Sequence, residues 1–214
     1  MYLYYCDLRT CQLAPDVIFS RLNLTDRQRF QALKNPLLKQ QFSVARCVIK
    51  QALFNHFQIP LDHQYQFENF KKWMVDGSGS TFYLSISHSK NIVAVAITQS
   101  PGLLGVDVEL QKTRDFINLA EMFSTPSELA LVKKSQDIKH TFYRLWTVKE
   151  AYLKAKHLVL TDMLKIDLST CLLNDNEHVS GAYYHHYQTL SQDQYVLSLL
   201  SSKKLIGSAC EMVI

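Results

Sequence analysis

Residues 146–154 read Trp146-Thr147-Val148-Lys149-Glu150-Ala151-Tyr152-Leu153-Lys154. A related stretch, Phe42-Ser43-Val44-Ala45-Arg46-Cys47-Val48-Ile49-Lys50, stands 104 residues earlier, and its aromatic, hydroxyl, valine and lysine positions coincide with those of the later one. Both stretches carry apolar residues at helical spacing. A repeat at a fixed offset is typical of a duplicated unit. The sequence therefore predicts two similar halves, residues 1–103 and residues 104–214, related by a pseudo-twofold axis.

Two further segments align at the same offset. Residues 92–96 fall on residues 196–200, and residues 2–6 near the start fall on residues 106–110. Chance similarity between amphipathic segments is the alternative, and three alignments at one offset favour duplication. Each half then reads as a strand, a helical region, a long amphipathic helix and a pair of strands.

The expected secondary structure is mixed. In the first half, Pro36 favours the start of a long helix. Pro60 predicts that this helix ends a few residues before position 60. Residues 82–98 then alternate as a strand, a turn and a strand. In the second half, strands near residues 183–190 and 194–201 follow the long helix. The predicted fold class is α+β, with a small, mostly antiparallel sheet packed on a long helix in each half.

Four side chains in the second half form the strongest chemical pattern. Gly105-Val106-Asp107-Val108-Glu109 reads as a strand, and alternation puts Asp107 and Glu109 on one face. The helix adds Glu150 at the edge of its apolar stripe and Lys154 one turn further on. Three carboxylates suit a hard divalent cation such as magnesium, and a nearby lysine can contact a phosphate bound there. Taken separately, the strand pair can be a solvated acidic face, and Glu150 with Lys154 a surface ion pair.

Candidate anion-binding groups lie in the first half. Ser87-His88-Ser89 ends a predicted strand, where it is either a polar turn or a phosphate-binding element made of hydroxyls and an imidazole. Lys39, Arg46 and Lys50 share one side of the first long helix, which is either solvated or faces a phosphate-rich ligand. Lys71-Lys72-Trp73 is either a plain loop or a cation beside a surface on which a base can stack.

Composition narrows the function classes. No apolar run of about 18 residues occurs, so no membrane span is expected, and residues 1–7 do not resemble a secretion signal. Five scattered cysteines without a C-x-x-C pair predict reduced thiols in a cytoplasm and no structural zinc site. The net charge of +4 permits a polyanionic ligand or an acidic partner. No nucleic-acid-binding motif, Walker loop or G-x-G-x-x-G is present.

These motifs resemble those of the 4'-phosphopantetheinyl transferases. The family signature is G-[IV]-D-[IV]-E, then F-S-x-x-E, then W-[ST]-x-K-E-[AS]-x-x-K. The chain matches it at residues 105–109, at Phe123-Ser124 with Glu128, and at residues 146–154. Ser87-His88-Ser89 matches an upstream S-H-S element of the family. The two-half length resembles the surfactin-synthetase-activator (Sfp) type, a monomeric pseudo-dimer.

The resemblance implies a reaction. Such enzymes move the phosphopantetheine arm of coenzyme A onto a serine of an apo acyl or peptidyl carrier protein and release adenosine 3',5'-bisphosphate. Asp107, Glu109 and Glu150 are implied as ligands of magnesium, with manganese as the alternative. Glu150, Lys154 and Asp107 are implied as the catalytic residues. Glu150 is the candidate base for the carrier serine, and Lys154 contacts the reacting phosphate or protonates the leaving group.

The resemblance also implies binding residues and partners. The side chains implied to hold coenzyme A are Arg46, Lys72, Ser87, His88 and Lys154, with His88 at the 3'-phosphate. The expected partners are coenzyme A and the carrier, without nucleic acid or membrane, and the expected state is a monomer in the cytoplasm. Lys71-Lys72-Trp73 departs from the family's frequent Gly-Lys-Pro, and Glu128 stands one residue later than the usual spacing.

Two other functions remain open from the sequence. The first is a homologue that holds coenzyme A or a carrier without turnover. The second is a magnesium-dependent phosphohydrolase that uses the same carboxylates on another substrate.

Overall fold

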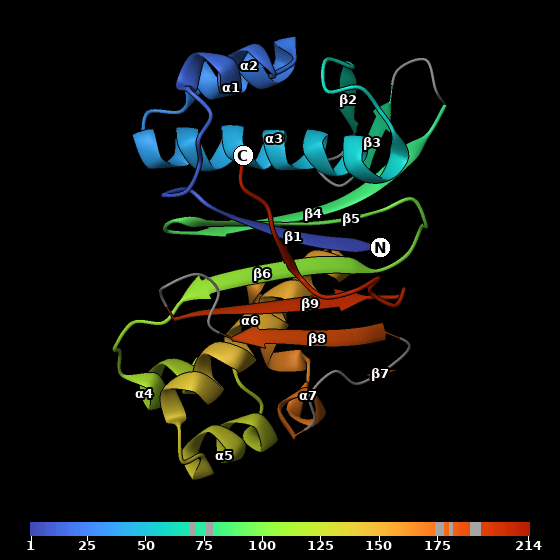
Figure 1. Cartoon of the computed structure of the whole chain (residues 1–214). Helices are drawn as coiled ribbons and strands as arrows, with labels where there is room; N and C mark the ends of the chain where they lie inside the picture. Colours follow the sequence, from blue (N-terminus) through green and yellow to red (C-terminus); the bar gives the residue numbers. More distant parts are fainter. Residues whose placement is uncertain (69–71, 76–78, 174–177, 180–181, 189–193) are drawn as a thin grey trace. The chain divides into compact units, whose positions relative to one another are not determined.

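The structure, a computed structural model, describes residues 1–68, 72–75, 79–173, 178–179, 182–188 and 194–214 (Figure 1). Tertiary contacts divide the chain into two compact units. The first comprises Met1–Pro101 and Leu205–Ile214, and the second comprises Gly102–Lys204. Both units contain helices and a sheet, so the predicted mixed α+β class is confirmed.

The first unit holds a sheet with the strand order β10-β1-β5-β4-β3-β2. Its elements are β1 (Tyr2–Asp7), α1 (Pro15–Ser20), α2 (Leu24–Ala32), α3 (Pro36–Phe57), β2 (Tyr65–Glu68), β3 (Lys72–Val75), β4 (Thr81–Ser89), β5 (Ile92–Thr98) and β10 (Cys210–Glu211). All pairs in this sheet are antiparallel except β1 with β10. The predicted helix from Pro36 and the strand pair over residues 82–98 are therefore confirmed.

The C-terminal segment belongs to the first unit. Strand β10 pairs in parallel with β1, and the amide of Met212 donates to the carbonyl of Tyr5 at 2.8 Å. Ile214 adds a second link, because its carbonyl accepts from the amide of Gln12. The two compact units thus differ from the predicted halves 1–103 and 104–214 in residues 102–103 and 205–214, and the halves stay a prediction of domain organisation.

Helix α3 begins and ends where its sequence signals lie. The Asn35 side chain accepts from the amides of Leu37 and Leu38, and Pro36 opens the first turn. At the other end, Gln58 adopts a left-handed conformation two residues before Pro60. Valines of α3 share one buried core with valines of β5; these are Val44, Val48, Val93 and Val95.

The second unit holds a sheet with the strand order β6-β9-β8-β7. Its elements are β6 (Leu104–Leu110), α4 (Phe116–Glu121), α5 (Pro126–Lys134), α6 (Ile138–Lys156), the 3₁₀ helix η1 (Leu160–Lys165), α7 (Ser169–Leu173), β7 (His178–Val179), β8 (Ala182–Gln188) and β9 (Tyr195–Ser201). The strands predicted near residues 183–190 and 194–201 correspond to β8 and β9. In Figure 1, β6, β9 and β8 run side by side next to α6.

Corresponding elements of the two units lie within a few residues of the predicted offset, while the pseudo-twofold axis stays a prediction. In each unit the opening strand pairs antiparallel with the last strand of the hairpin, as β1 with β5 and β6 with β9. Tyr2 lies opposite Ile97, whereas Val106 lies opposite Leu199, so the second pairing is displaced by two residues. Because side chains alternate with a period of two, a two-residue displacement keeps each side chain on the same face.

Two other expectations concern the whole chain. All five cysteines are free thiols, as predicted. Among the described residues, no helix has the length and apolarity needed to cross a bilayer.

Candidate active site

The site begins with a close contact between β6 and α6. A Cβ atom added to Gly105 would lie 1.8 Å from the carbonyl oxygen of Ala151 and 2.9 Å from the amide nitrogen of Ala155. Only a residue without a side chain permits this approach of strand to helix. Gly105 thus explains why the signature begins with glycine, a role that the sequence interpretation did not assign.

The same face of β6 carries the two predicted acidic residues. Gly105, Asp107 and Glu109 alternate with Val106 and Val108, so their side of the strand is the one against α6. Asp107 is only 4% exposed, and Glu109 is half-buried. The sequence prediction that the two carboxylates share a face agrees with this register.

Lys154 contacts this strand from the last turn of α6. Its Nζ donates to Asp107 Oδ1 at 2.7 Å and to the carbonyl oxygen of Val106 at 3.1 Å. The side chain of Lys154 keeps about a third of its surface exposed, at 30%, while that of Asp107 is 6% exposed. The ammonium group therefore lies between a buried carboxylate and the solvent.

Glu150 is the third carboxylate, and its electrostatic environment links it to the other two. Burial raises the pKa of Glu150, the charges of Asp107 and Glu109 raise it further, and Lys154 acts in the opposite direction. Two neighbouring negative charges disfavour a third, which makes Glu150 a stronger base than an isolated glutamate. The four predicted side chains therefore belong to one electrostatic group within the second unit.

The donor chemistry of this group fits a hard divalent cation, because all three acidic side chains offer carboxylate oxygens. Their present arrangement is looser than a closed ligand shell. Within the described part of the chain, no three His, Cys, Asp or Glu side chains lie close enough together to hold a metal ion. Lys154 engages one oxygen of Asp107.

Two further motif residues attach α6 to its surroundings. Thr147 Oγ1 lies 2.7 Å from Ser198 Oγ, and Ser198 is the β9 residue opposite Asp107. Lys149 is fully buried, and its Nζ donates to the carbonyls of Phe123 and Met163 at 2.9 and 2.8 Å. These contacts hold the helix in the rotation that turns Glu150 toward β6.

Glu128 is a structural residue of the second unit. Its Oε2 lies 2.6 Å from Lys149 Nζ and accepts from the amide of Thr125, and its Oε1 accepts from the amide of Leu168. The Thr125 hydroxyl in turn accepts from the amide of Glu128, which forms a capping box at the start of α5. The carboxylate is fully buried and saturated, so it is not a fourth acidic group of the site.

Of the three basic side chains predicted on α3, Arg46 and Lys50 lie in the interior of the first unit, whereas Lys39 is half-buried. Arg46 is 5% exposed, and its Nε donates to Asp26 Oδ1 at 3.1 Å, with the guanidinium over the Phe42 ring. Lys50 is 2% exposed and donates to the carbonyl of Leu61 at 3.0 Å. The idea of a solvated basic face is therefore wrong for these two residues, because acidic and carbonyl partners compensate their burial.

The S-H-S element and the lysine pair fall on strands of the first sheet. On β4, Ser87 is buried and His88 is exposed, as expected for successive residues that point to opposite faces. Lys72 begins β3, where it pairs with Tyr83 of β4, but its side chain lies outside the described ones. Lys71 lies outside the described residues altogether.

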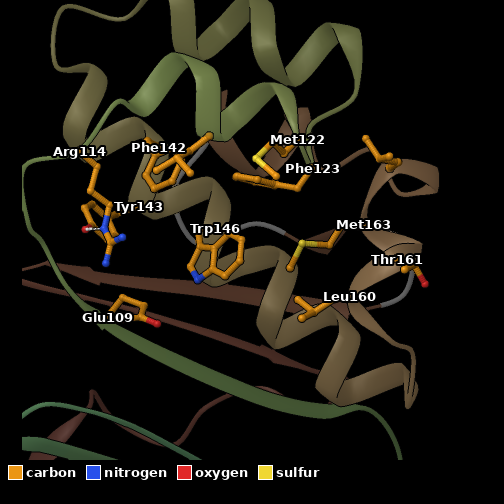
Figure 2. Close-up of a pocket in the computed structure, with 12 residues that line it drawn as sticks. Glu109, Arg114, Met122, Phe123, Phe142, Tyr143, Trp146, Leu160, Thr161 and Met163 are labelled. Atoms are coloured by element: carbon orange, nitrogen blue, oxygen red, sulfur yellow. Dashed lines mark hydrogen bonds between the residues drawn. The ribbon is translucent and has the colours of Figure 1, made fainter.

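A cavity of about 550 Å³ opens beside the acidic group, entirely within the second unit (Figure 2). Its aromatic lining consists of Phe123, Phe142, Tyr143 and Trp146. Glu109 also lines this cavity, so the acidic group and the cavity are continuous. Trp146 of the signature therefore lines a cavity that adjoins Glu109.

Comparison with known proteins agrees with this assembly of motifs. Residues 103–203 match the sequence model of the 4'-phosphopantetheinyl transferase superfamily. The chain is 29% identical over 126 residues to the 4'-phosphopantetheinyl transferase HetI of Nostoc sp., a match that covers 56% of this chain and 53% of that protein.

Two further relatives carry the same name. A 4'-phosphopantetheinyl transferase of Bacillus subtilis is 31% identical over 100 residues, which cover 46% of this chain and 42% of the relative. The 4'-phosphopantetheinyl transferase gsp of Aneurinibacillus migulanus is 39% identical over 75 residues, with coverages of 34% and 30%. The chain spans about half the length of the first curated relatives it matches.

Proposed function

We propose that the chain, whose residues 103–203 match the 4'-phosphopantetheinyl transferase superfamily, transfers the phosphopantetheine arm of coenzyme A to a serine of an apo acyl or peptidyl carrier protein. One observation carries the proposal. The acidic group of β6 and α6, with Lys154 bound to Asp107, combines carboxylates and an ammonium group at one place. That combination suits displacement at a phosphorus atom.

The proposed step is a substitution at the phosphorus that bears the pantetheine arm. The carrier serine Oγ forms the new P–O bond, and the bond to the bridging oxygen of the diphosphate breaks. Adenosine 3',5'-bisphosphate leaves with that oxygen and its charge. The serine proton passes to Glu150, directly or through a water molecule. The position of Glu150 in one electrostatic group with Asp107 and Lys154 supports this role, because the carboxylate then stands beside the ammonium group that would stabilise the leaving diphosphate.

Lys154 is proposed to stabilise the charge that develops on the diphosphate. Its contact with Asp107 orients the ammonium group, and its partial exposure leaves it accessible to a phosphate. An ammonium group is a compact point charge with rotatable donors, so it can keep its contact while the phosphoryl group passes from coenzyme A to the carrier serine.

Asp107, Glu109 and Glu150 are the residues that would hold magnesium, with manganese as the alternative for the same oxygen ligands. When bound, the cation supplies charge neutralisation on the diphosphate. The charge of the cation would also reduce the repulsion among the three carboxylates that raises the pKa of Glu150.

The finer parts of the proposal follow the family resemblance. Ser87, His88 and Lys72 of the first unit are proposed to contact the phosphates of coenzyme A. The resemblance also implies Arg46, but its buried ion pair with Asp26 favours an indirect role, in which the Arg46 side chain stabilises the first unit around α3. A monomer of the two-half Sfp type, acting in the cytoplasm, is the proposed state. The shared order of elements in the two units supports the two-half type.

The test is intact-protein mass spectrometry of a purified apo-carrier incubated with this protein, coenzyme A and magnesium. A mass gain of one phosphopantetheine arm, abolished by a chelator, is the expected result. Asp107→Ala should reduce the transfer at least about a hundredfold, because metal-assisted charge stabilisation supplies several kcal/mol. The matched control is Asp115→Asn, at the exposed N-cap of α4, which should transfer normally.

The alternatives give different results in the same assay. A non-catalytic binder would hold coenzyme A and leave every fatty-acid, polyketide and peptidyl carrier unmodified. A phosphohydrolase would consume coenzyme A without any carrier. Either outcome would replace the proposed function.

A further inference from the structure

Three of the five cysteines gather in the core of the first unit. Cys6 of β1 and Cys47 of α3 are fully buried in one hydrophobic cluster, and Cys11, in the connection between β1 and α1, packs against the same cluster. All three are free thiols. The proposed transfer reaction uses none of them. Neighbouring thiols of this kind can react with one another when one of them is oxidised.

The chain reverses direction between Cys6 and Cys11. The amide of Thr10 donates to the carbonyl of Asp7 at 3.1 Å, and the Thr10 hydroxyl donates to the same carbonyl at 3.0 Å, which closes a four-residue turn. The Cys6 thiol donates to this carbonyl as well, at 3.7 Å, so its sulfur lies at the turn. Residues opposite each other across a tight turn are typically about 4.5–5.5 Å apart at Cα, within the range of about 4.4–6.8 Å that a disulfide spans.

Ile214 connects the two cysteine positions a second time. Its amide donates to the sulfur of Cys6. Its carbonyl accepts from the amides of Gln12 and Leu13, the two residues that follow Cys11. Ile214 also belongs to the hydrophobic cluster that contains Cys6 and against which Cys11 packs. The turn and these bonds therefore hold Cys6 and Cys11 beside each other.

The two thiols differ in accessibility. Cys6 is fully buried, and burial raises its pKa to about 12, with a further increase from the charge of Cys11. Cys11 is half-buried, and the residues on either side of it, Thr10 and Gln12, are exposed. A small oxidant in solution can therefore reach Cys11, whereas Cys6 stays a protonated thiol inside the cluster. An accessible thiol next to a second thiol is typical of a redox-sensitive pair.

We propose that Cys6 and Cys11 form a reversible disulfide when the protein meets a peroxide. The Cys11 thiolate attacks hydrogen peroxide and becomes a sulfenic acid, and the hydroxide that leaves takes up the proton released by Cys11. The Cys6 sulfur then attacks the sulfenic sulfur of Cys11. The S–S bond forms, and the sulfenic hydroxyl leaves with the Cys6 proton as water. Two thiols thus lose two electrons, and one peroxide is reduced to two water molecules.

Cys47 is the competing partner for Cys11. Burial raises the pKa of Cys47 to about 11, the charge of Arg21 lowers it, and the charge of Cys11 raises it. The Arg21 side chain also forms a hydrogen bond with the Cys47 sulfur. Cys6, unlike Cys47, shares with Cys11 both the closed turn and the bonds of Ile214. The geometry therefore favours Cys6 as the partner.

Peptide mass spectrometry tests the inference on the full chain. The reduced protein is desalted, treated with hydrogen peroxide, blocked with N-ethylmaleimide under denaturing conditions and digested with trypsin. Trypsin cleaves after Arg9, Arg21, Arg46 and Lys50, so the three thiols fall on separate peptides, residues 1–9, 10–21 and 47–50. The expected product is peptide 1–9 linked to peptide 10–21, in protein that stays monomeric on a non-reducing gel. Dithiothreitol should release the two peptides.

One variant and one control locate the bond. Cys11→Ser changes a half-buried residue, should leave the circular dichroism spectrum unchanged and should abolish the linked peptide. The control Cys210→Ser removes the exposed thiol of the same unit and should keep the linked peptide in full.

Three results would overturn the inference: a link between peptides 10–21 and 47–50, oxidation of Cys11 to a sulfinic acid without any link, or a Cys11 that peroxide leaves reduced. The inference does not depend on the proposed function, because none of these measurements involves coenzyme A or a carrier.

Discussion

Lys149 Nζ lies 2.6 Å from Glu128 Oε2, and both side chains are fully buried in the second unit. The pair joins α5 to α6, while the same carboxylate accepts from the amide of Leu168 and the same ammonium group donates to the carbonyls of Phe123 and Met163. Burial lowers the pKa of Lys149, and the hydrogen bond and charge of Glu128 oppose that effect. The lysine next to Glu150 in the signature is thus a structural residue that fixes the helix.

Removing one member of this pair should destabilise the fold. Lys149→Met leaves the Glu128 carboxylate buried without its cation, a change that costs about 3–5 kcal/mol in comparable pairs. Urea unfolding measures the loss. The control is Lys133→Met, whose partner Glu121 lies at 2.8 Å with both side chains 47% exposed, and which should change stability by less than about 1 kcal/mol. Equal effects of the two variants would contradict the structural role of Lys149.

Gly105→Ala should force β6 away from α6. The added methyl group would meet the backbone of Ala151 and Ala155, which cannot rotate aside, so the cost should reach or exceed the upper end of the usual range of about 1–3 kcal/mol for overpacking. Gly79→Ala is the contrast, because a Cβ there meets nothing within 4 Å and only the left-handed backbone is strained, at about 1–2 kcal/mol. Thermal unfolding of both variants shows which substitution lowers the stability more, and Gly105→Ala is expected to do so. The close contact is refuted if Gly105→Ala is the milder change.

The pKa of Glu150 should respond to its acidic neighbours. Burial is its largest cause and the charge of Asp107 the next, so Asp107→Asn should lower the pKa toward that of an ordinary glutamate. Carbon-13 NMR titration of labelled glutamate side chains in the metal-free protein reports the shift directly. A raised carboxyl pKa means that the folded chain holds the proton more tightly than the unfolded chain. The contribution of Glu150 to stability therefore falls as pH rises through its folded pKa.

His186 should make the fold sensitive to acid. Its ring nitrogens have no hydrogen-bond partner among the described residues, and burial, followed by the charges of Arg144 and His140, lowers its pKa to about 3. The unfolded chain binds this proton near the ordinary histidine pKa of about 6.5, so stability should fall by up to about 2 kcal/mol between pH 7.5 and pH 5. His186→Phe should flatten this part of the urea-unfolding profile. An unchanged profile would refute the assignment to His186.

Arg46 separates a structural role from a nucleotide contact. Arg46→Met leaves Asp26 buried without its cation, so it should destabilise the chain by about 3–5 kcal/mol. The double variant Asp26→Asn with Arg46→Met should recover part of that loss, and the recovered protein can be titrated with coenzyme A. Unchanged affinity in the double variant identifies Arg46 as structural. A large loss of affinity with recovered stability would instead assign it a direct phosphate contact.

Local signals of the sequence were sufficient for most elements and for the acidic group. Pro36 and Pro60 bound α3 because proline permits only certain backbone conformations. Asp107 and Glu109 share a face because strand side chains alternate. The repeat at one offset predicted corresponding strands and helices in both units, since the same periodicity specifies the same kind of element.

Tertiary structure alone decided which charged residues are buried and which contacts are close. The spacing of Arg46 and Lys50 indicated one side of a helix, but that side is covered by Asp26 and backbone carbonyls supplied from other segments. Glu128 carries a carboxylate, as the site residues do, but this carboxylate neutralises the buried ammonium group of Lys149. Gly105 matters through Ala151, and β10 joins β1 across nearly the whole chain. Periodicity is a property of neighbouring residues, whereas these pairings depend on long-range packing that determines which charges must be compensated.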